Sequence, residues 1–157
     1  MEARTDAKHR GRAYVLPPAG FLAALATVAA ASALPAGEWP AQPWNFLGLV
    51  PLGLGLALAM AAERQFVRAG TPVRPFTEPA AVVSDGLFRW SRNPMYLGLI
   101  LALVGTALLL SSVLALLAAP AYGWWVRRRF IAREERLLEE RFGDAYRAYC
   151  LRVRRWV

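Results

Sequence analysis

Two short stretches carry the side chains best suited to bind a charged ligand. In the first, WSRNPMYLG, the residues Arg92, Asn93 and Pro94 stand directly before an apolar run. Asn is a favoured N-cap and Pro a favoured first helical residue, so the pair predicts a helix that begins at Pro94. A helix N-terminus offers free N–H groups and the positive end of the helix dipole, which favour an anion such as a carboxylate. Arg92 taken alone is better explained as a basic anchor at a membrane interface.

The second stretch is RRRFIAREERLLEERF, which contains Glu134 and Glu135. On a regular helix its apolar stripe consists of Phe130, Ile131, Leu137, Leu138 and Phe142. Glu134 falls near the middle of this stripe and Glu135 at its edge. A carboxylate on a packing face is costly without a partner. Two interpretations stay open: an ion pair with Arg141 or with an Arg of the preceding loop, or a role in binding a cationic ligand.

The sequence does not contain the motifs of other common catalytic or binding sites. The sequence contains no Ser-His-Asp set, no hydrolase-like carboxylate pair and no Gly-rich phosphate loop, and Gly53 and Gly55 are better explained by close helix packing. The single cysteine, Cys150, excludes an internal disulfide, the single histidine is His9 in a polar tail, and we predict no metal site. A helix start and a carboxylate that bind opposite charges would suit a zwitterionic ligand.

The elements that must position these residues are membrane helices. Of the 157 residues, 57% are hydrophobic, and they gather in blocks at 18–34, 46–62 and 94–126, the last broken at Ser111-Ser112. Blocks of this length match transmembrane helices and a tight two-helix hairpin. We therefore predict an all-α integral membrane protein with four transmembrane helices in two hairpins, a cytoplasmic Pro-rich loop, C-terminal cytoplasmic helices and no Rossmann domain.

The basic residues indicate the orientation. Four precede the first block, five lie between Arg64 and Arg92, and ten follow from Arg127 onward. With four spans all of them fall on one side, which the positive-inside rule makes the cytoplasm. The prediction is a multi-pass membrane protein, in the inner membrane if bacterial, with both termini cytoplasmic and no nucleic-acid partner. The first block also resembles a signal peptide, although the later spans favour a retained helix.

The chain divides into a basic arm (1–16), a first hairpin (17–69) and a core (70–157). The core comprises a loop (70–93), a second hairpin (94–126) and C-terminal helices (127–155). Three prolines exclude a regular helix from the loop, and its apolar residues Val82, Val83, Leu87 and Phe88 predict that it packs on the rest of the protein. Gly143 should end one C-terminal helix and Asp144 cap the next, on which Tyr146 and Tyr149 are expected to be packing residues.

Taken together, GTPVRPFTEPAAVVSDGLFRWSRNPMYLG and REERLLEERFGDAYRAYCLRVRR resemble the isoprenylcysteine carboxyl methyltransferase family, which shares a layout with phospholipid N-methyltransferases. The resemblance covers residues 70–155 and implies S-adenosylmethionine as cofactor, with S-adenosylhomocysteine as product. It implies that the loop and the C-terminal helix wrap the cofactor, through contacts that we assign to Val82, Val83, Phe88, Arg92, Asn93, Pro94, Met95, Tyr96, Glu134 and Glu135.

The resemblance also implies an arginine that orients the substrate, for which Arg129 and Arg133 are candidates, and no catalytic residue is assigned with certainty. Asn93 replaces a histidine common in eukaryotic members. Because an amide does not titrate near neutral pH, this position is not expected to supply a base.

The expected activity is direct methyl transfer to a lipophilic acceptor embedded in the membrane, without a covalent enzyme intermediate. A prenylated cysteine, a phospholipid amine, or a small hydrophobic carboxylate or thiol would each fit. The alternatives are a phospholipid N-methyltransferase, a non-catalytic membrane scaffold or binder, and a nicotinamide-dependent membrane reductase; no basic cluster for a 2′-phosphate favours the last. Expected partners are the bilayer and a lipophilic or lipidated acceptor. The short chain also makes a homodimer conceivable.

Overall fold

The structure, a computed structural model, describes residues 17–34, 42–70 and 81–157. The expected basic arm (1–16), residues 35–41 in the turn of the first hairpin and residues 71–80 of the Pro-rich loop lie outside the described residues. Every regular element in the described residues is a helix, and none is a strand. This confirms the predicted all-α class for that part of the chain.

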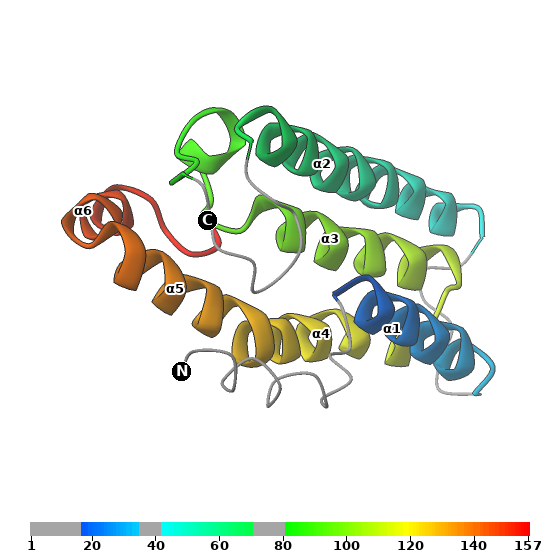
Figure 1. Ribbon diagram of the computed structural model, residues 1–157. Helices are drawn as coiled ribbons and strands as arrows, with labels where there is room; N and C mark the ends of the chain where they lie inside the picture. The colour runs from blue at the N-terminus through cyan, green and yellow to red at the C-terminus, as the bar shows by residue number, and fades with distance from the viewer. Residues whose placement is uncertain (1–16, 35–41, 71–80) are drawn as a thin grey trace.

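Six α-helices are described, and they are drawn in Figure 1: α1 (Pro17–Ser32), α2 (Leu49–Arg68), α3 (Pro94–Leu109), α4 (Ala118–Val126), α5 (Ala132–Phe142) and α6 (Asp144–Arg152). Short 3₁₀-helices lie at Trp44–Gly48, Gly86–Arg89 and Leu114–Leu117, and a π-helix at Arg127–Ile131 joins α4 to α5. The chain is therefore helical without a break from Leu114 to Phe142.

Local signals place the ends of two helices. α3 begins at Pro94, as Asn93-Pro94 predicts. α5 ends at Phe142 because Gly143 adopts a φ of +48°, a left-handed backbone that favours glycine. The prediction that Asp144 caps α6 is wrong, since Asp144 is the first residue of that helix and Gly143 holds the cap position without a side-chain hydrogen bond.

By length and composition, one helical segment among the described residues is able to cross a membrane. It comprises Trp44–Arg68, with 25 residues and a mean hydropathy of 1.8. The apolar segments Pro18–Ser32 and Pro94–Leu109 are shorter, and α4 has nine residues because a 3₁₀-helix and a π-helix flank it. Several large apolar side chains of α2, Leu54 and Met60 among them, are at least half exposed.

α2 and α3 cross closely through small residues. Gly55 and Ala59 of α2, and Gly48 of the 3₁₀-helix before it, face Gly98, Ala102 and Gly105 of α3. A methyl group added at Gly55 would lie 2.5 Å from the carbonyl oxygen of Gly98, so the two backbones are in contact. The packing role predicted for Gly55 is confirmed. The same prediction for Gly53 is wrong, because no atom lies within 4 Å of a methyl group added there.

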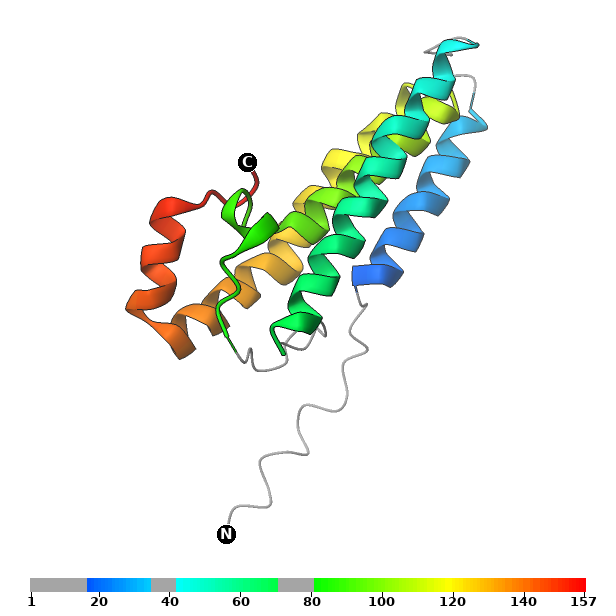
Figure 2. The ribbon, with the colours of Figure 1, turned by 90° about the horizontal axis from the view of Figure 1, so that it is seen from above.

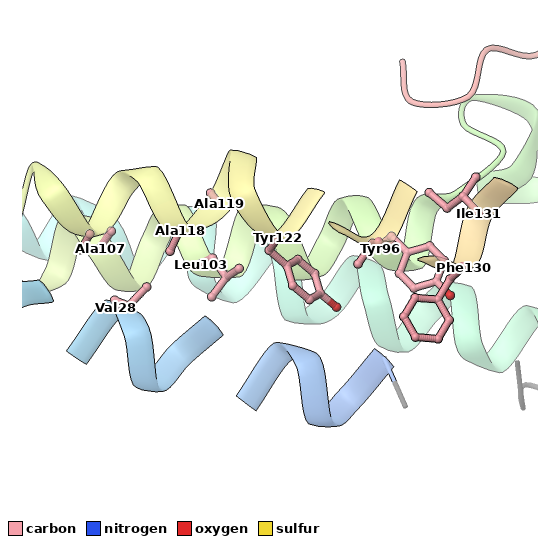
Figure 3. Packing of buried hydrophobic residues seen from close by; sticks show 11 residues of the cluster. Val28, Tyr96, Leu103, Ala107, Ala118, Ala119, Tyr122, Phe130 and Ile131 are labelled. Carbon is pink, nitrogen blue, oxygen red and sulfur yellow. The ribbon is translucent and has the colours of Figure 1, made fainter. Parts of the chain in front are cut away.

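The main core lies between α1, α3 and α4 and continues into the π-helix (Figure 3). Alanines of α3 and α4 let these helices approach, and larger side chains fill the remaining space. Its labelled members in Figure 3 are Val28, Tyr96, Leu103, Ala107, Ala118, Ala119, Tyr122, Phe130 and Ile131. The core thus ends at Tyr96, Phe130 and Ile131, which fixes the start of α3 against the junction between α4 and α5.

α1 to α4 lie side by side, whereas α5, α6, residues 81–93 and the C-terminus gather at one end (Figure 2). In the described residues every Asp, Glu and Arg lies at this charged end, within 63–68, 85–92 and 127–155. Two large apolar side chains at the same end are nevertheless strongly exposed, Trp90 by 80% and Leu151 by 90%. The charged end therefore contains the polar groups from which a site can be built.

Candidate functional site

The first part of the candidate site is the start of α3. Asn93 occupies the N-cap position and Pro94 the first helical position, but the Asn93 side chain makes no capping hydrogen bond. Its Nδ2 instead donates to the carbonyl oxygen of Arg155 at 3.1 Å. The predicted helix start is confirmed, and the predicted side-chain cap is wrong because the amide is engaged by the C-terminal segment.

Glu134 of α5 contacts the first turn of α3. The Tyr96 hydroxyl donates a hydrogen bond to Glu134 Oε1 at 3.1 Å. Burial raises the pKa of Glu134 from 4.5 to about 6; the Tyr96 hydrogen bond opposes this shift and the charge of Glu135 adds to it. The sequence allowed an Arg as partner, whereas the group that donates here is a neutral phenol. Among the residues that the structure describes, no cationic group pairs with this carboxylate, and a neutral donor does not compensate its negative charge.

Glu135, one residue further along α5, lies in an ion-pair cluster. Its carboxylate is held by both donors of the Arg155 fork, Nε at 2.9 Å and Nη2 at 2.6 Å. Arg92 Nη1 lies 3.3 Å from Oε1 of the same carboxylate. The side chains of Arg92 and Glu135 are only 15% and 17% exposed, so solvent screens this pair weakly. The ion pair with a loop Arg that the sequence offered for Glu134 is therefore formed by Glu135 instead.

The described part of the loop is ordered, as predicted. The ring of Phe88 is buried and meets Phe66 of α2 edge-on, with ring centroids 4.9 Å apart. The N–H of Leu87 donates to Gln65 Oε1 at 3.1 Å. The Tyr149 hydroxyl donates to the Phe88 carbonyl oxygen at 2.8 Å, and burial raises the pKa of Tyr149 to about 12, which keeps this donor protonated.

A second apolar cluster holds α6 against the loop. Tyr146, Tyr149 and Val153 are its buried members, and Val82, Leu138, Phe142 and Cys150 pack against them. The packing role expected for Tyr146 and Tyr149 is confirmed. The apolar stripe predicted along 130–142 is consequently divided: Phe130 and Ile131 join the main core, whereas Leu138 and Phe142 join this cluster. Glu134 and Glu135 lie between the two clusters.

The structure thus brings part of the predicted set into direct contact. Tyr96 meets Glu134, and Arg92 meets Glu135, with Asn93 and Pro94 at the intervening helix start. Val82 and Phe88 belong to the loop that packs on α6. Val83 and Met95 are partly buried. The two substrate-orienting candidates, Arg129 in the π-helix and Arg133 in α5, are exposed.

Sequence reasoning missed Arg155, Ser91 and Cys150. Ser91 Oγ accepts from the N–H of Asn93 at 3.1 Å, and Arg92 Nη1 donates to Cys150 Sγ. In the sequence Arg155 is one of ten basic residues after the last span, and nothing separates it from its exposed neighbour Arg154. The role of Arg155 depends on the path of the C-terminal segment, and a helical pattern in the sequence does not predict that path.

Within residues 17–34, 42–70 and 81–157, no three His, Cys, Asp or Glu side chains are grouped as a metal site would require. What the site offers is an uncompensated carboxylate, a neighbouring cluster of two guanidinium groups and one carboxylate, and a helix N-terminus. Such an arrangement can bind a small ligand that carries both charges.

The described residues form an all-helical protein with an apolar bundle and a cluster of polar and charged side chains at one end. A family model described as phospholipid methyltransferase matches residues 44–145. The chain belongs to the phospholipid methyltransferase family, and this membership supports a membrane methyltransferase.

Two curated proteins are similar to the chain. An uncharacterized protein of Haemophilus influenzae is 44% identical over 63 residues, which are 40% of this chain and all of that protein. The protein-S-isoprenylcysteine O-methyltransferase of Schizosaccharomyces pombe is 32% identical over 72 residues, which are 46% of this chain and 30% of that enzyme. The chain therefore matches less than a third of the yeast enzyme's length. No solved structure matches the chain significantly.

Proposed function

We propose that the protein is an S-adenosylmethionine-dependent methyltransferase that modifies a lipophilic acceptor within the membrane. The observation that carries the proposal is the Tyr96–Glu134 pair beside the Arg92–Glu135–Arg155 cluster at the start of α3. Membership of a methyltransferase family supplies the reaction class. The chemistry of the side chains supplies the argument for the cofactor.

The donor set fits a zwitterionic cofactor. The N-terminus of α3 and the adjoining guanidinium of Arg92 suit the cofactor carboxylate. Glu134, which carries a charge that its phenol neighbour does not neutralise, suits a cationic group of the cofactor, either its ammonium or its sulfonium. Once bound, the cofactor supplies an electrophilic methyl group on sulfur.

The residues of the chain act by binding, orienting and excluding water. Tyr96 is packed in the main core with Phe130 and Ile131, and its hydroxyl orients the carboxylate of Glu134 through the hydrogen bond. Transfer of the methyl group to an acceptor nucleophile would break the bond from carbon to sulfur and release the thioether S-adenosylhomocysteine, and correct positioning would account for much of the acceleration of such a displacement. No side chain has to form a covalent intermediate.

The acceptor decides whether a base is needed. A carboxylate acceptor, as the name of the yeast relative suggests, carries no proton that must leave. A phospholipid amine is the second candidate, favoured by the description of the matching family. Its ammonium must lose a proton before the nitrogen can attack, and no residue is assigned to accept that proton.

The same proposal includes a four-span arrangement with both termini in the cytoplasm. Support comes from the side-by-side packing of α1 to α4 and from the confinement of Asp, Glu and Arg side chains in the described residues to one end. The water-soluble cofactor would then enter from the cytoplasm and the acceptor from the bilayer. A homodimer would extend the apolar wall around the acceptor.

The cofactor assignment is tested by calorimetry on the purified protein with S-adenosylmethionine and S-adenosylhomocysteine. Glu134→Gln should weaken binding at least about tenfold, the loss expected for one hydrogen bond to a charged group. Glu140→Gln, at an exposed position of the same helix, is the matched control and should bind like the wild type. Loss for both ligands assigns Glu134 to the ammonium, and loss for S-adenosylmethionine alone assigns it to the sulfonium. Wild-type protein that binds neither ligand would overturn the proposal.

The acceptor class is tested with methyl-labelled cofactor and fractionated membrane lipids. A labelled methyl ester releases methanol in mild alkali, whereas an N-methyl group does not. Alkali-labile label assigns a carboxylate acceptor, and alkali-stable label in the phospholipid fraction assigns an amine. Cofactor binding without label in any fraction would instead establish a non-catalytic binder.

A further inference from the structure

The C-terminal segment 153–156 connects both sides of the candidate site. It lies beside the turn that precedes α3 (Figure 1) and receives three hydrogen bonds from that turn. The bonds run from the Arg92 N–H to the Arg154 carbonyl oxygen at 3.0 Å, from Asn93 Nδ2 to the Arg155 carbonyl oxygen at 3.1 Å, and from Ser91 Oγ to the same oxygen at 3.4 Å. The backbone of this segment is therefore fixed to the helix start.

The side chain of Arg155 points from the same segment to the other side of the site. Its guanidinium donates hydrogen bonds to both carboxylate oxygens of Glu135 on α5. These hydrogen bonds raise the pKa of Arg155, so its guanidinium stays charged. One residue thus uses its carbonyl oxygen to hold Asn93 and its guanidinium to hold Glu135. A planar fork on a carboxylate also fixes direction, which a single hydrogen bond does not.

Apolar contacts secure the two ends of the segment. Val153 is buried in the second apolar cluster with Tyr146 and Tyr149. Trp156 packs against the main core. The segment therefore spans the distance between the two clusters, and the carboxylates of α5 lie along the same path.

We infer that residues 153–156 form a clasp that sets the spacing between the start of α3 and the carboxylates of α5, with Arg155 as its positioning residue. The inference rests on the proposed function, because the ligand whose affinity depends on that spacing is the proposed cofactor. Arg155 acts through Glu135 and Asn93 and is not assigned a contact with the cofactor.

Cys150 gives a readout that does not depend on any ligand. It is the sole cysteine of the sequence, it is partly buried, it packs against the cluster that contains Val153, and it accepts a hydrogen bond from Arg92. Its rate of labelling by a maleimide should report opening of the clasp. Arg155→Met should label about tenfold faster than the wild type, as expected when a hydrogen-bonded charge pair is removed.

The matched control is Arg154→Met, which removes the same charge from an exposed neighbour and leaves the backbone hydrogen bond to Arg92 intact. It should label and bind S-adenosylhomocysteine like the wild type, whereas Arg155→Met should bind about tenfold more weakly. Arg155→Lys keeps the charge but not the fork, so both its values should fall in between. This variant also provides the test if Arg155→Met does not fold.

The outcomes are distinct. Equal labelling of the Arg155 and Arg154 variants would overturn the clasp. Faster labelling of Arg155→Met with unchanged affinity for S-adenosylhomocysteine would overturn its positioning role. If the wild type binds neither S-adenosylmethionine nor S-adenosylhomocysteine, the proposed function fails, and the labelling rates alone decide whether the clasp exists.

Discussion

Two adjacent glutamates of α5 differ in charge environment because of residues far away in the sequence. Glu135 meets two guanidinium groups, whereas Glu134 meets a phenol 38 positions earlier in the chain. Helical periodicity located Glu134 within a packing face, which is the part of the site that the sequence predicts. It did not identify Tyr96 as its partner, because the rotation of α3 relative to α5 depends on the packing of the core.

Glu134→Gln should stabilise the ligand-free protein at neutral pH. Because burial raises the pKa of Glu134 from 4.5 to about 6, its ionised form lowers the free energy of unfolding at pH 7. This penalty, on the order of 2 kcal/mol, disappears as the pH falls through 6 to 4.5. Thermal unfolding in detergent should show a gain at pH 7 and none at pH 4.5. A variant less stable than the wild type at pH 7 would contradict the assignment.

Tyr96→Phe should shift the pH dependence of cofactor binding upward. The hydroxyl lowers the pKa of Glu134, so its removal raises that pKa above about 6. A cationic group binds the ionised carboxylate, and affinity should therefore begin to fall at a higher pH than in the wild type. Calorimetry between pH 5 and 8 in the wild type, Tyr96→Phe and Glu134→Gln measures this, with the Gln variant independent of pH. Coincident profiles for the wild type and Tyr96→Phe would refute it.

At the level of elements, local signals predict where helices begin and end better than they predict which faces meet. Pro94 and Gly143 act through their own backbone preferences, so the sequence alone locates those boundaries. The π-helix at Arg127–Ile131 contains Phe130 and Ile131 of the main core, and a regular 100° spacing did not predict it. The route of the C-terminal segment was missed for the same reason.

The seam between α2 and α3 provides a test at this scale. Gly55→Ala should cost about 1–3 kcal/mol, because its methyl group meets the backbone of α3 and the helices must separate. Gly53→Ala has open space and should be neutral or stabilise by up to about 1 kcal/mol through helix propensity. Thermal unfolding of both variants in one detergent makes the comparison. Equal effects would show that the seam is not close-packed.

At the scale of the whole molecule, the distribution of charged residues supports the proposed four-span topology. The described residues contain Arg, Asp and Glu at one end of the bundle, while the turn between α3 and α4 at the other end contains serines and apolar residues. The sequence predicted this separation from the order of its apolar and basic blocks, because charge is read along the chain and needs no tertiary contact.

The proposed topology is tested with single cysteines in a Cys150→Ser background. Val113→Cys, in the exposed turn between α3 and α4, should react with an impermeant maleimide added outside intact cells. Arg136→Cys, exposed on α5, should react only after the membrane is permeabilised. Equal labelling of both positions in intact cells would rule out the four-span arrangement.

The exposed Trp90 and Leu151 at the charged end bear on the depth of the site in the bilayer. An indole ring prefers the headgroup level, where its apolar body and its N–H are both accommodated. Trp90 immediately precedes the turn from which α3 begins, so in the proposed arrangement Tyr96 lies less than two helical turns below the headgroups. At this depth a lipid can present its polar head without leaving the membrane, and a cofactor can dissociate into water without crossing hydrocarbon.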